Sequence, residues 1–207
     1  MGVESLTMKL FPIRLVLDAG HGGEDGGAVS LTGVPESQIN LAITLRMEEI
    51  LALCGIPTQP LRRQDISLYS KGARSLREKK VSDLHNRVEE IQREENTVLV
   101  SIHQNSFPQE SIHGAQVFYH NSSSEGKLLA ELIQKELVSK VDRENKRQAK
   151  GNTNYYLLKK TKVPLVIVEC GFLSNSREAE LLCEEDYQDR VAYAICMGIL
   201  KYLSLGE

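Results

Sequence analysis

The sequence predicts a single α/β domain in which a mixed, mostly parallel, twisted β-sheet is flanked by helices. The main observation is the order of the segments: short apolar, β-branched runs alternate with longer segments whose apolar residues recur at helical spacing. A second observation is size, because 207 residues with 41% hydrophobic residues suit one ordinary globular core. We find no internal repeat and no low-complexity linker that would divide the chain.

The first half of the chain predicts strands that run into polar loops. Residues 13–17 are aliphatic and end at Asp18, where a glycine-rich run begins, so a strand passes into a loop there. Apolar residues at helical spacing follow Pro35, and Gly55 ends that helix. The expected strands of this half are 13–17, 56–61 and 97–102, and the expected helices are 35–54 and 76–94.

The second half continues the alternation. Ser122 and Asn175 each precede a glutamate by three residues, which is a pattern typical of helix N-termini. The run 165–168 is wholly apolar, as expected for a strand covered on both faces. The remaining expectations are strands at 115–119 and 155–158, a solvated basic loop at 143–150, a helix to about Val141 and a last helix over 187–202.

Composition excludes several classes of protein. A net charge of -3 argues against a nucleic-acid binder, and 5% aromatic residues with no Trp argue against a module that stacks sugars or single-stranded DNA. We expect no membrane span, because no run of about 18 apolar residues occurs. Residues 1–12 are too short and too polar for a signal peptide and are interpreted as an N-terminal extension or expression remnant, so the domain is expected at 13–205.

Polar side chains follow three of the predicted strands. His21 follows the first strand, His103 ends the third, and Glu169 follows the apolar run 165–168. If these strands are parallel, their carboxyl ends meet at one edge of the sheet, and Glu36 joins them if the glycine loop folds back. Two imidazoles and a carboxylate suit zinc with an open position for water, for which Glu169 would be the general base.

Other interpretations of these residues remain open from spacing alone. A dinucleotide site is disfavoured because Asp25 stands where the last fingerprint glycine belongs, and Glu24 and Asp25 would repel phosphate. A histidine after a strand is more often a surface residue, and Glu36 also suits a helix N-terminus. Glu169 is harder to explain structurally, because a buried carboxylate without a partner is costly.

Four motifs in order resemble the zinc-dependent N-acetylmuramoyl-L-alanine amidases of the Amidase_3 family. They are DAGHGGEDGGA, Glu36 with Asn40-Leu41, SIHQNS and VECGFLSN. The resemblance covers about residues 14–203 and implies the family's mixed sheet flanked by helices. It implies that His21, Glu36 and His103 bind Zn²⁺, that Glu169 is catalytic, and that Asn105 orients its surroundings.

A narrower resemblance, to the germination-specific amidases of spore formers, rests on residues 79–87, GAQVFYH, the loop at 147–150 and the ending YQDRVAYAICMGILKYL. It implies hydrolysis of the bond between N-acetylmuramic acid and L-alanine in cortex peptidoglycan, ahead of muramic-δ-lactam formation. It also implies an accessory lipoprotein in some members. Action would be extracytoplasmic, secreted or membrane-anchored, although no leader is visible in this sequence. The alternatives are another zinc amidohydrolase or carboxypeptidase, or a non-catalytic peptidoglycan-binding protein.

Overall fold

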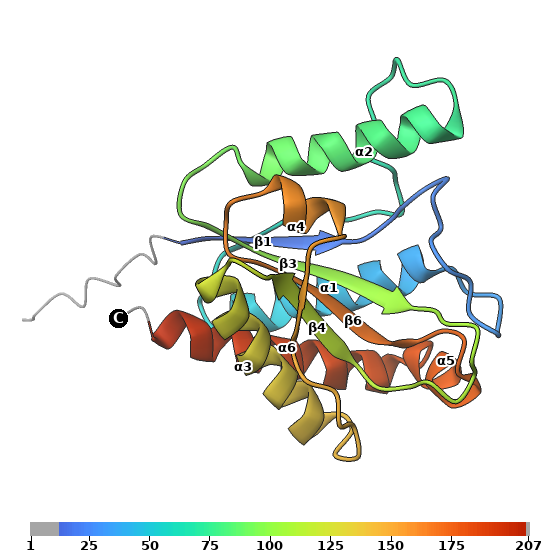
Figure 1. The fold of residues 1–207 in the computed structure, drawn as a ribbon, viewed down its shortest axis with the longest axis vertical. Helices are drawn as coiled ribbons and strands as arrows, with labels where there is room; N and C mark the ends of the chain where they lie inside the picture. The colour runs from blue at the N-terminus through green and yellow to red at the C-terminus, as the bar shows by residue number, and fades with distance from the viewer. Residues whose placement is uncertain (1–12, 206–207) are drawn as a thin grey trace, which may run out of the picture.

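The computed structural model describes residues 13–205 (Figure 1), and the predicted N-terminal extension, residues 1–12, lies outside the described residues. The strands are β1 (Arg14–Ala19), β2 (Thr58–Pro60), β3 (Thr97–Asn105), β4 (Gln116–His120), β5 (Lys150–Asn152) and β6 (Leu165–Phe172). The helices are α1 (Glu36–Leu53), α2 (Leu76–Ile91), α3 (Ser124–Lys140), α4 (Tyr156–Lys160), α5 (Ser176–Leu182) and α6 (Glu185–Ser204).

The strands form one six-stranded sheet in the order β2-β1-β3-β6-β4-β5. The first four strands in this order run parallel, whereas β4 is antiparallel to β6 and β5 is parallel to β4. The prediction of a mixed, mostly parallel sheet is confirmed. Because β1, β3 and β6 are parallel neighbours, their carboxyl ends lie together at the same edge of the sheet.

Helices cover both faces of this sheet. α1, α3 and α6 pack against one face, and α2 and α4 pack against the other (Figure 1). Neighbouring residues on one strand enter opposite cores, so Leu15 and Leu17 face α1 while Val16 faces α2. Residues 165–172 are buried throughout, which confirms the expectation for 165–168. Each fully buried aliphatic side chain stabilises the fold by roughly 1.5–3 kcal/mol.

The prediction of a strand at 155–158 is wrong, because this segment forms the N-cap and the start of the short helix α4. The Asn152 side chain accepts hydrogen bonds from the backbone N–H groups of Asn154 and Tyr155, at 2.6 and 3.2 Å, and this turns the chain out of β5. Leu157 and Leu158 remain buried, in the core that they share with α2. A four-residue apolar run carries too little periodicity to distinguish a strand from a helix.

The predicted helix starts at Ser122 and Asn175 are close to those observed. The cap of α3 is Ser123, one residue later, whose hydroxyl accepts a hydrogen bond from the Gly126 N–H at 2.9 Å. Asn175 caps α5 as predicted. The Glu178 carboxylate, however, accepts hydrogen bonds from the N–H groups of Gly114 and Phe172, and so ties the end of β6 to the segment before β4.

No helix within residues 13–205 combines the length and the apolar character needed to cross a lipid bilayer.

Candidate metal centre and active site

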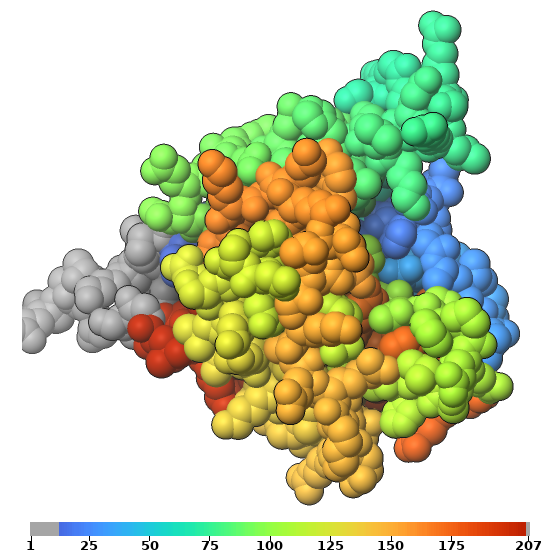
Figure 2. Space-filling view, viewed as in Figure 1, coloured from blue at the N-terminus to red at the C-terminus, as the bar shows by residue number. Residues whose placement is uncertain are grey.

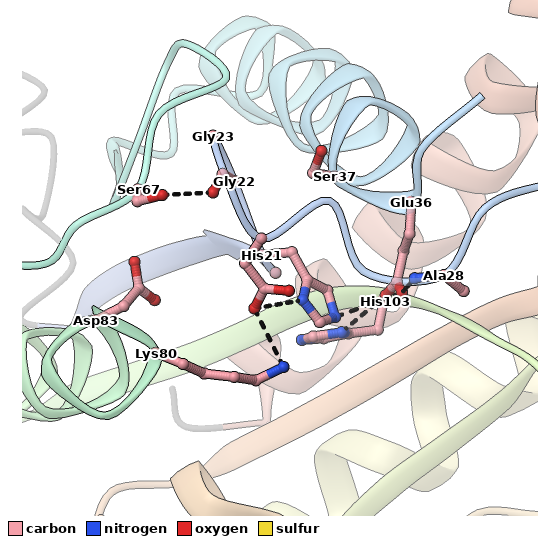
Figure 3. Close-up of polar contacts among 12 residues, drawn as sticks. His21, Gly22, Gly23, Ala28, Glu36, Ser37, Ser67, Lys80, Asp83 and His103 are labelled. Atoms are coloured by element: carbon pink, nitrogen blue, oxygen red, sulfur yellow. Dashed lines mark hydrogen bonds and ion pairs between the residues drawn. The ribbon is translucent and has the colours of Figure 1, made fainter. Parts of the chain in front are cut away.

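His21, Glu36 and His103 come together at the carboxyl edge of the sheet (Figure 3). His21 lies in the loop after β1, Glu36 is the first residue of α1, and His103 lies near the end of β3. Each offers a ligand atom within 4.8 Å of the others. His103 Nδ1 lies 3.0 Å from Glu36 Oε1, and His21 Nε2 lies 3.4 Å from Glu36 Oε2. The convergence predicted from strand order, including the return of the glycine loop toward Glu36, is therefore present.

The glycine-rich loop allows this close approach. Gly27 has a φ of +71°, and a Cβ there would lie 2.5 Å from Glu36 Oε2 and 2.8 Å from His21 Cδ2. Any larger residue would therefore collide with two of the three candidate ligands. The glycines that superficially suggest a phosphate loop serve instead to bring a backbone against a carboxylate and an imidazole.

Two buried arginines hold the loop that carries His21. His21 has a φ of +61°, a left-handed conformation that non-glycine residues seldom adopt without support. Arg87, from α2, donates a hydrogen bond to the His21 carbonyl at 2.7 Å. Arg62 donates to the carbonyls of Ala19 and Gly20 at 2.9 and 3.1 Å. Sequence analysis missed both arginines, because each acts on residues distant in the sequence.

Arg87 is itself held by two carboxylates. It pairs with Asp18 at the end of β1 and donates to Asp83 Oδ2 at 2.6 Å. Ser101 donates a further hydrogen bond to Asp18 at 2.6 Å. Burial alone would raise the pKa of Asp18, but the Arg87 guanidinium and the Ser101 hydroxyl outweigh burial and lower that pKa. The spacing of Asp83 and Arg87, four residues apart on a helix, was the available sequence signal.

Glu36 is buried and almost fully hydrogen-bonded. The Gln104 N–H donates to Oε1 at 3.0 Å and the Ala28 N–H donates to Oε2 at 2.9 Å. Burial would raise the pKa of Glu36, yet the hydrogen bonds with His103 and His21 hold it far below its usual range. Glu36 is therefore an ionised carboxylate whose two oxygens face the two imidazoles.

The remaining neighbours of Glu36 orient it. Asn40 donates to the Gly20 carbonyl at 3.1 Å and to Glu36 Oε1 at 3.3 Å. The Gln104 side chain donates to Asn40 Oδ1 at 3.1 Å. Gln104 thus supports Asn40, a role that sequence analysis did not assign.

Asp25 orients the ring of His21. Its Oδ2 lies 3.0 Å from His21 Nδ1 and 3.3 Å from Lys80 Nζ. Burial works against protonation, but Asp25 and Glu36 together raise the pKa of His21 to about 9. Because the Asp25 carboxylate holds Nδ1, Nε2 is directed at the ligand cluster, which is formed by His21, Glu36 and His103. A carboxylate on the second ring nitrogen is usual in metal-binding histidines. Asp25 lies inside the DAGHGGEDGGA motif, but its role there requires the structure.

These residues fit a zinc ion. His21 directs Nε2 and His103 directs Nδ1 toward Glu36, whose carboxylate is ionised, so that the three ligands supply two imidazole nitrogens and one oxygen. Three protein ligands with one position left open is the donor set of catalytic zinc sites. The carboxylate partner of His21 adds the second layer of support that such sites have.

Glu169 lies on β6 directly opposite His103 on β3. It is 6% exposed, which confirms the burial expected from its apolar surroundings. Tyr155 donates a hydrogen bond to its Oε1 at 3.0 Å, whereas Oε2 is buried and has no partner among the described residues. Burial raises the pKa of Glu169, partly offset by the electrostatic interaction with His103 and by the hydrogen bond from Tyr155. The geometry places an unsatisfied carboxylate oxygen beside the ligand cluster.

Asn105, the last residue of β3, forms hydrogen bonds with other residues than the candidate ligands. Its side chain accepts a hydrogen bond from the Ser106 N–H at 2.8 Å, and its carbonyl accepts from the Leu173 N–H at 2.8 Å. Among residues 13–205 no hydrogen bond joins its side chain to His103 or Glu169. Its orienting role therefore stays a prediction.

A pocket of about 100 Å³ opens beside the two imidazoles, with walls that include Leu84 of α2 and Tyr155 and Tyr156 at the start of α4. In Figure 2 the surface is hollowed between the green of α2, the orange of α4 and the blue of the loop after β1. A second cavity of about 240 Å³ shares Asp25, Lys80 and Asp83 with the first. Together they form a groove that runs from the ligand cluster along α2.

A buried glutamate beside a histidine–glutamate–histidine cluster, at the carboxyl edge of an α/β sheet, is an arrangement that suits the class of metal-assisted hydrolases. Within this class the chain belongs to the Amidase_3 family of N-acetylmuramoyl-L-alanine amidases, whose sequence profile it matches over residues 15–201. It is therefore an amidase of cell-wall peptidoglycan, a hydrolase.

Individual relatives agree with this assignment. The germination-specific N-acetylmuramoyl-L-alanine amidase of Bacillus subtilis is 36% identical over 190 residues, which cover 92% of this chain and 79% of the relative. The CwlD amidase of Clostridioides difficile, solved in complex with the GerS lipoprotein, is 42% identical with a TM-score of 0.89, covering 93% of this chain and 99% of that one. The amidase AmiC2 of Nostoc punctiforme is 32% identical with a TM-score of 0.78, covering 93% and 97%.

Proposed function

We propose that this chain is a zinc-dependent amidase that hydrolyses the amide between N-acetylmuramic acid and L-alanine in spore-cortex peptidoglycan. The observation that carries the proposal is the cluster of His21, Glu36 and His103 beside the unsatisfied Oε2 of Glu169. Residues 13–205 are the catalytic domain. His21 Nε2, His103 Nδ1 and the Glu36 carboxylate hold the ion, and Asn105 orients the end of β3.

Zinc, when bound, would act as a Lewis acid that lowers the pKa of a water molecule to about 7 and polarises the lactyl carbonyl. Oε2 of Glu169 accepts one proton from the attacking water, while the water oxygen forms a bond to the lactyl carbonyl carbon. Glu169 then gives the proton to the nitrogen of L-alanine as the carbon–nitrogen bond breaks. The products are a free lactyl carboxylate on the glycan and a stem peptide with a free amino terminus.

The chain's own residues prepare this step. Arg62 and Arg87 hold the loop that presents His21, and Asp25 fixes its ring. The groove along α2 lies next to the ligand cluster and gives an extended substrate room on that side. Substrate recognition in the catalytic groove agrees with the scarcity of aromatic residues noted in the sequence.

The cortex role is supported by the relatives. The germination-specific amidase of Bacillus subtilis and the CwlD amidase of Clostridioides difficile each align over more than nine-tenths of this chain. Since the latter was solved with the GerS lipoprotein, we include an accessory lipoprotein in the proposal. The enzyme acts outside the cytoplasmic membrane, secreted or membrane-anchored, and removes stem peptides ahead of muramic-δ-lactam formation.

The test is digestion of cortex and of vegetative peptidoglycan with zinc present, followed by mass analysis of the muropeptides. We expect stem peptides beginning at L-alanine and glycans with free lactyl groups. His103→Ala should lose zinc and activity together, whereas Glu169→Gln should keep zinc and lose turnover. Cleavage within the stem peptide would indicate a carboxypeptidase, and binding without cleavage would indicate a non-catalytic protein.

A further inference from the structure

Tyr155 contacts one oxygen of Glu169 and leaves the other free. Its hydroxyl donates a hydrogen bond to Oε1 at 3.0 Å, whereas Oε2 is buried without a partner among residues 13–205. Tyr155 precedes α4 as its N-terminal cap residue and lines the pocket that also contains His21 and His103. The two oxygens of one carboxylate therefore have different surroundings, and the difference comes from a segment outside the four sequence motifs.

We propose that Tyr155 is a positioning residue that makes Oε2 of Glu169 the oxygen that receives the proton. By holding Oε1, the hydroxyl restricts rotation of the carboxylate and leaves Oε2 as the oxygen that is free to accept a proton. The inference rests on the proposed function, since it requires Glu169 to be the base.

The surroundings of Tyr155 suit this task. Its ring meets the ring of Phe118, on β4, edge to face at a centroid distance of 5.5 Å and an interplanar angle of 61°. Burial, and then the negative charge of Glu169, raise the pKa of Tyr155, so its hydroxyl keeps its proton and remains a donor. Asn152 accepts a hydrogen bond from the Tyr155 N–H at 3.2 Å, which fixes the backbone at the start of α4. Ring and backbone are thus both anchored before substrate arrives.

Tyr155→Phe separates positioning from packing. The variant keeps the ring and its contact with Phe118 and removes only the hydroxyl. Tyr193→Phe is the matched control, because Tyr193 is exposed on α6, away from this pocket, and its hydroxyl takes part in no hydrogen bond found among residues 13–205. Both variants are assayed for kcat, KM, bound zinc and melting temperature on purified muropeptides.

We expect Tyr155→Phe to lower kcat about tenfold or more, the effect of one hydrogen bond to a charged group. KM should change less than about twofold, because the variant keeps the aromatic ring that lines the pocket. Bound zinc should match the wild type, and Tyr193→Phe should behave like the wild type in every measurement. A kcat for Tyr155→Phe within about twofold of the wild type, an equal loss in both variants, or a loss of zinc would overturn the inference.

Glu169→Gln, measured alongside, separates the two proposals. If Glu169→Gln turns over like the wild type, the proposed role of Glu169 fails and the role of Tyr155 fails with it. If Glu169→Gln is inactive with zinc bound while Tyr155→Phe is unimpaired, the base is upheld and only the positioning role is overturned.

Discussion

A Cβ atom added to Gly20 would lie 2.2 Å from the imidazole ring of His103. Gly20, the residue before His21, therefore packs directly against the imidazole ring of His103, another candidate ligand. Because this contact joins the loop after β1 to β3, the positions of the two histidines are coupled through a single residue that has no side chain.

Gly20→Ala should displace His103 and weaken metal binding. Overpacking of this kind costs about 1–3 kcal/mol of folding free energy, and we expect the strain to appear mainly as lost zinc. Gly72→Ala is the control, since a Cβ there meets nothing within 4 Å. Zinc content and urea unfolding measure both effects. Wild-type zinc affinity in Gly20→Ala would show that the ring accommodates the methyl group elsewhere.

Asp25→Ala should weaken zinc binding by about 10–100-fold, the usual effect of removing a carboxylate that orients a metal-binding histidine. The neighbouring Glu24→Ala is the control, because Glu24 pairs with Lys79 at 2.8 Å on the exposed surface. Competition with a chromogenic chelator gives both dissociation constants. Equal affinities in the two variants would mean that His21 keeps its orientation without Asp25.

Zinc should stabilise the folded protein by mass action. Free zinc at about 100 times its dissociation constant should add about 2.7 kcal/mol to the free energy of unfolding. In His103→Ala this increment should be largely absent. Urea unfolding of chelator-treated protein, with and without added zinc, measures it. A full increment in His103→Ala would place the ion elsewhere in the molecule.

Asp18→Asn should destabilise the protein by about 3 kcal/mol near neutral pH, because it leaves the buried Arg87 without one of its carboxylates. Since the pKa of Asp18 is lowered on folding, the stabilisation is complete above the unfolded value of about 3.9 and is lost as the pH falls through the folded value.

The difference between the wild type and Asp18→Asn should therefore shrink below about pH 4, which urea unfolding at several pH values can follow. Glu94→Gln, which removes a partly exposed partner of Arg14, should cost less than about 1 kcal/mol. A difference that stays constant down to about pH 3 would contradict the role assigned to Asp18.

The sequence predicted that His21, His103 and Glu169 meet at one edge of the sheet, because each stands at or after the carboxyl end of a strand and these ends lie together in a parallel sheet. The approach of Glu36 follows from the return of the glycine loop, and the roles of the four residues stay predictions. Arg62, Arg87 and Tyr155 did not follow, because each acts across the sheet or between layers. Local sequence periodicity does not predict which backbone carbonyl an arginine will contact, or which carboxylate a tyrosine will contact.

The failure at 155–158 has the same origin. Apolar spacing indicated burial correctly, since Leu157 and Leu158 are buried. The Asn152 side chain, which ends β5, decides instead that the following segment turns into α4. A single side chain that captures two backbone N–H groups thus outweighed the β-propensity of the run that follows it.

The order of the site residues along the chain separates the candidate metal ligands from the proposed base. His21, Glu36 and His103 all precede β4, whereas Glu169 lies on β6. A chain that ends before β6 contains the three candidate metal ligands found among residues 13–205 and lacks Glu169, the residue proposed as the base. With the proposed role of Glu169, the strand that completes the sheet between β3 and β4 also completes the hydrolytic site, so that metal binding and hydrolysis depend on different parts of the chain.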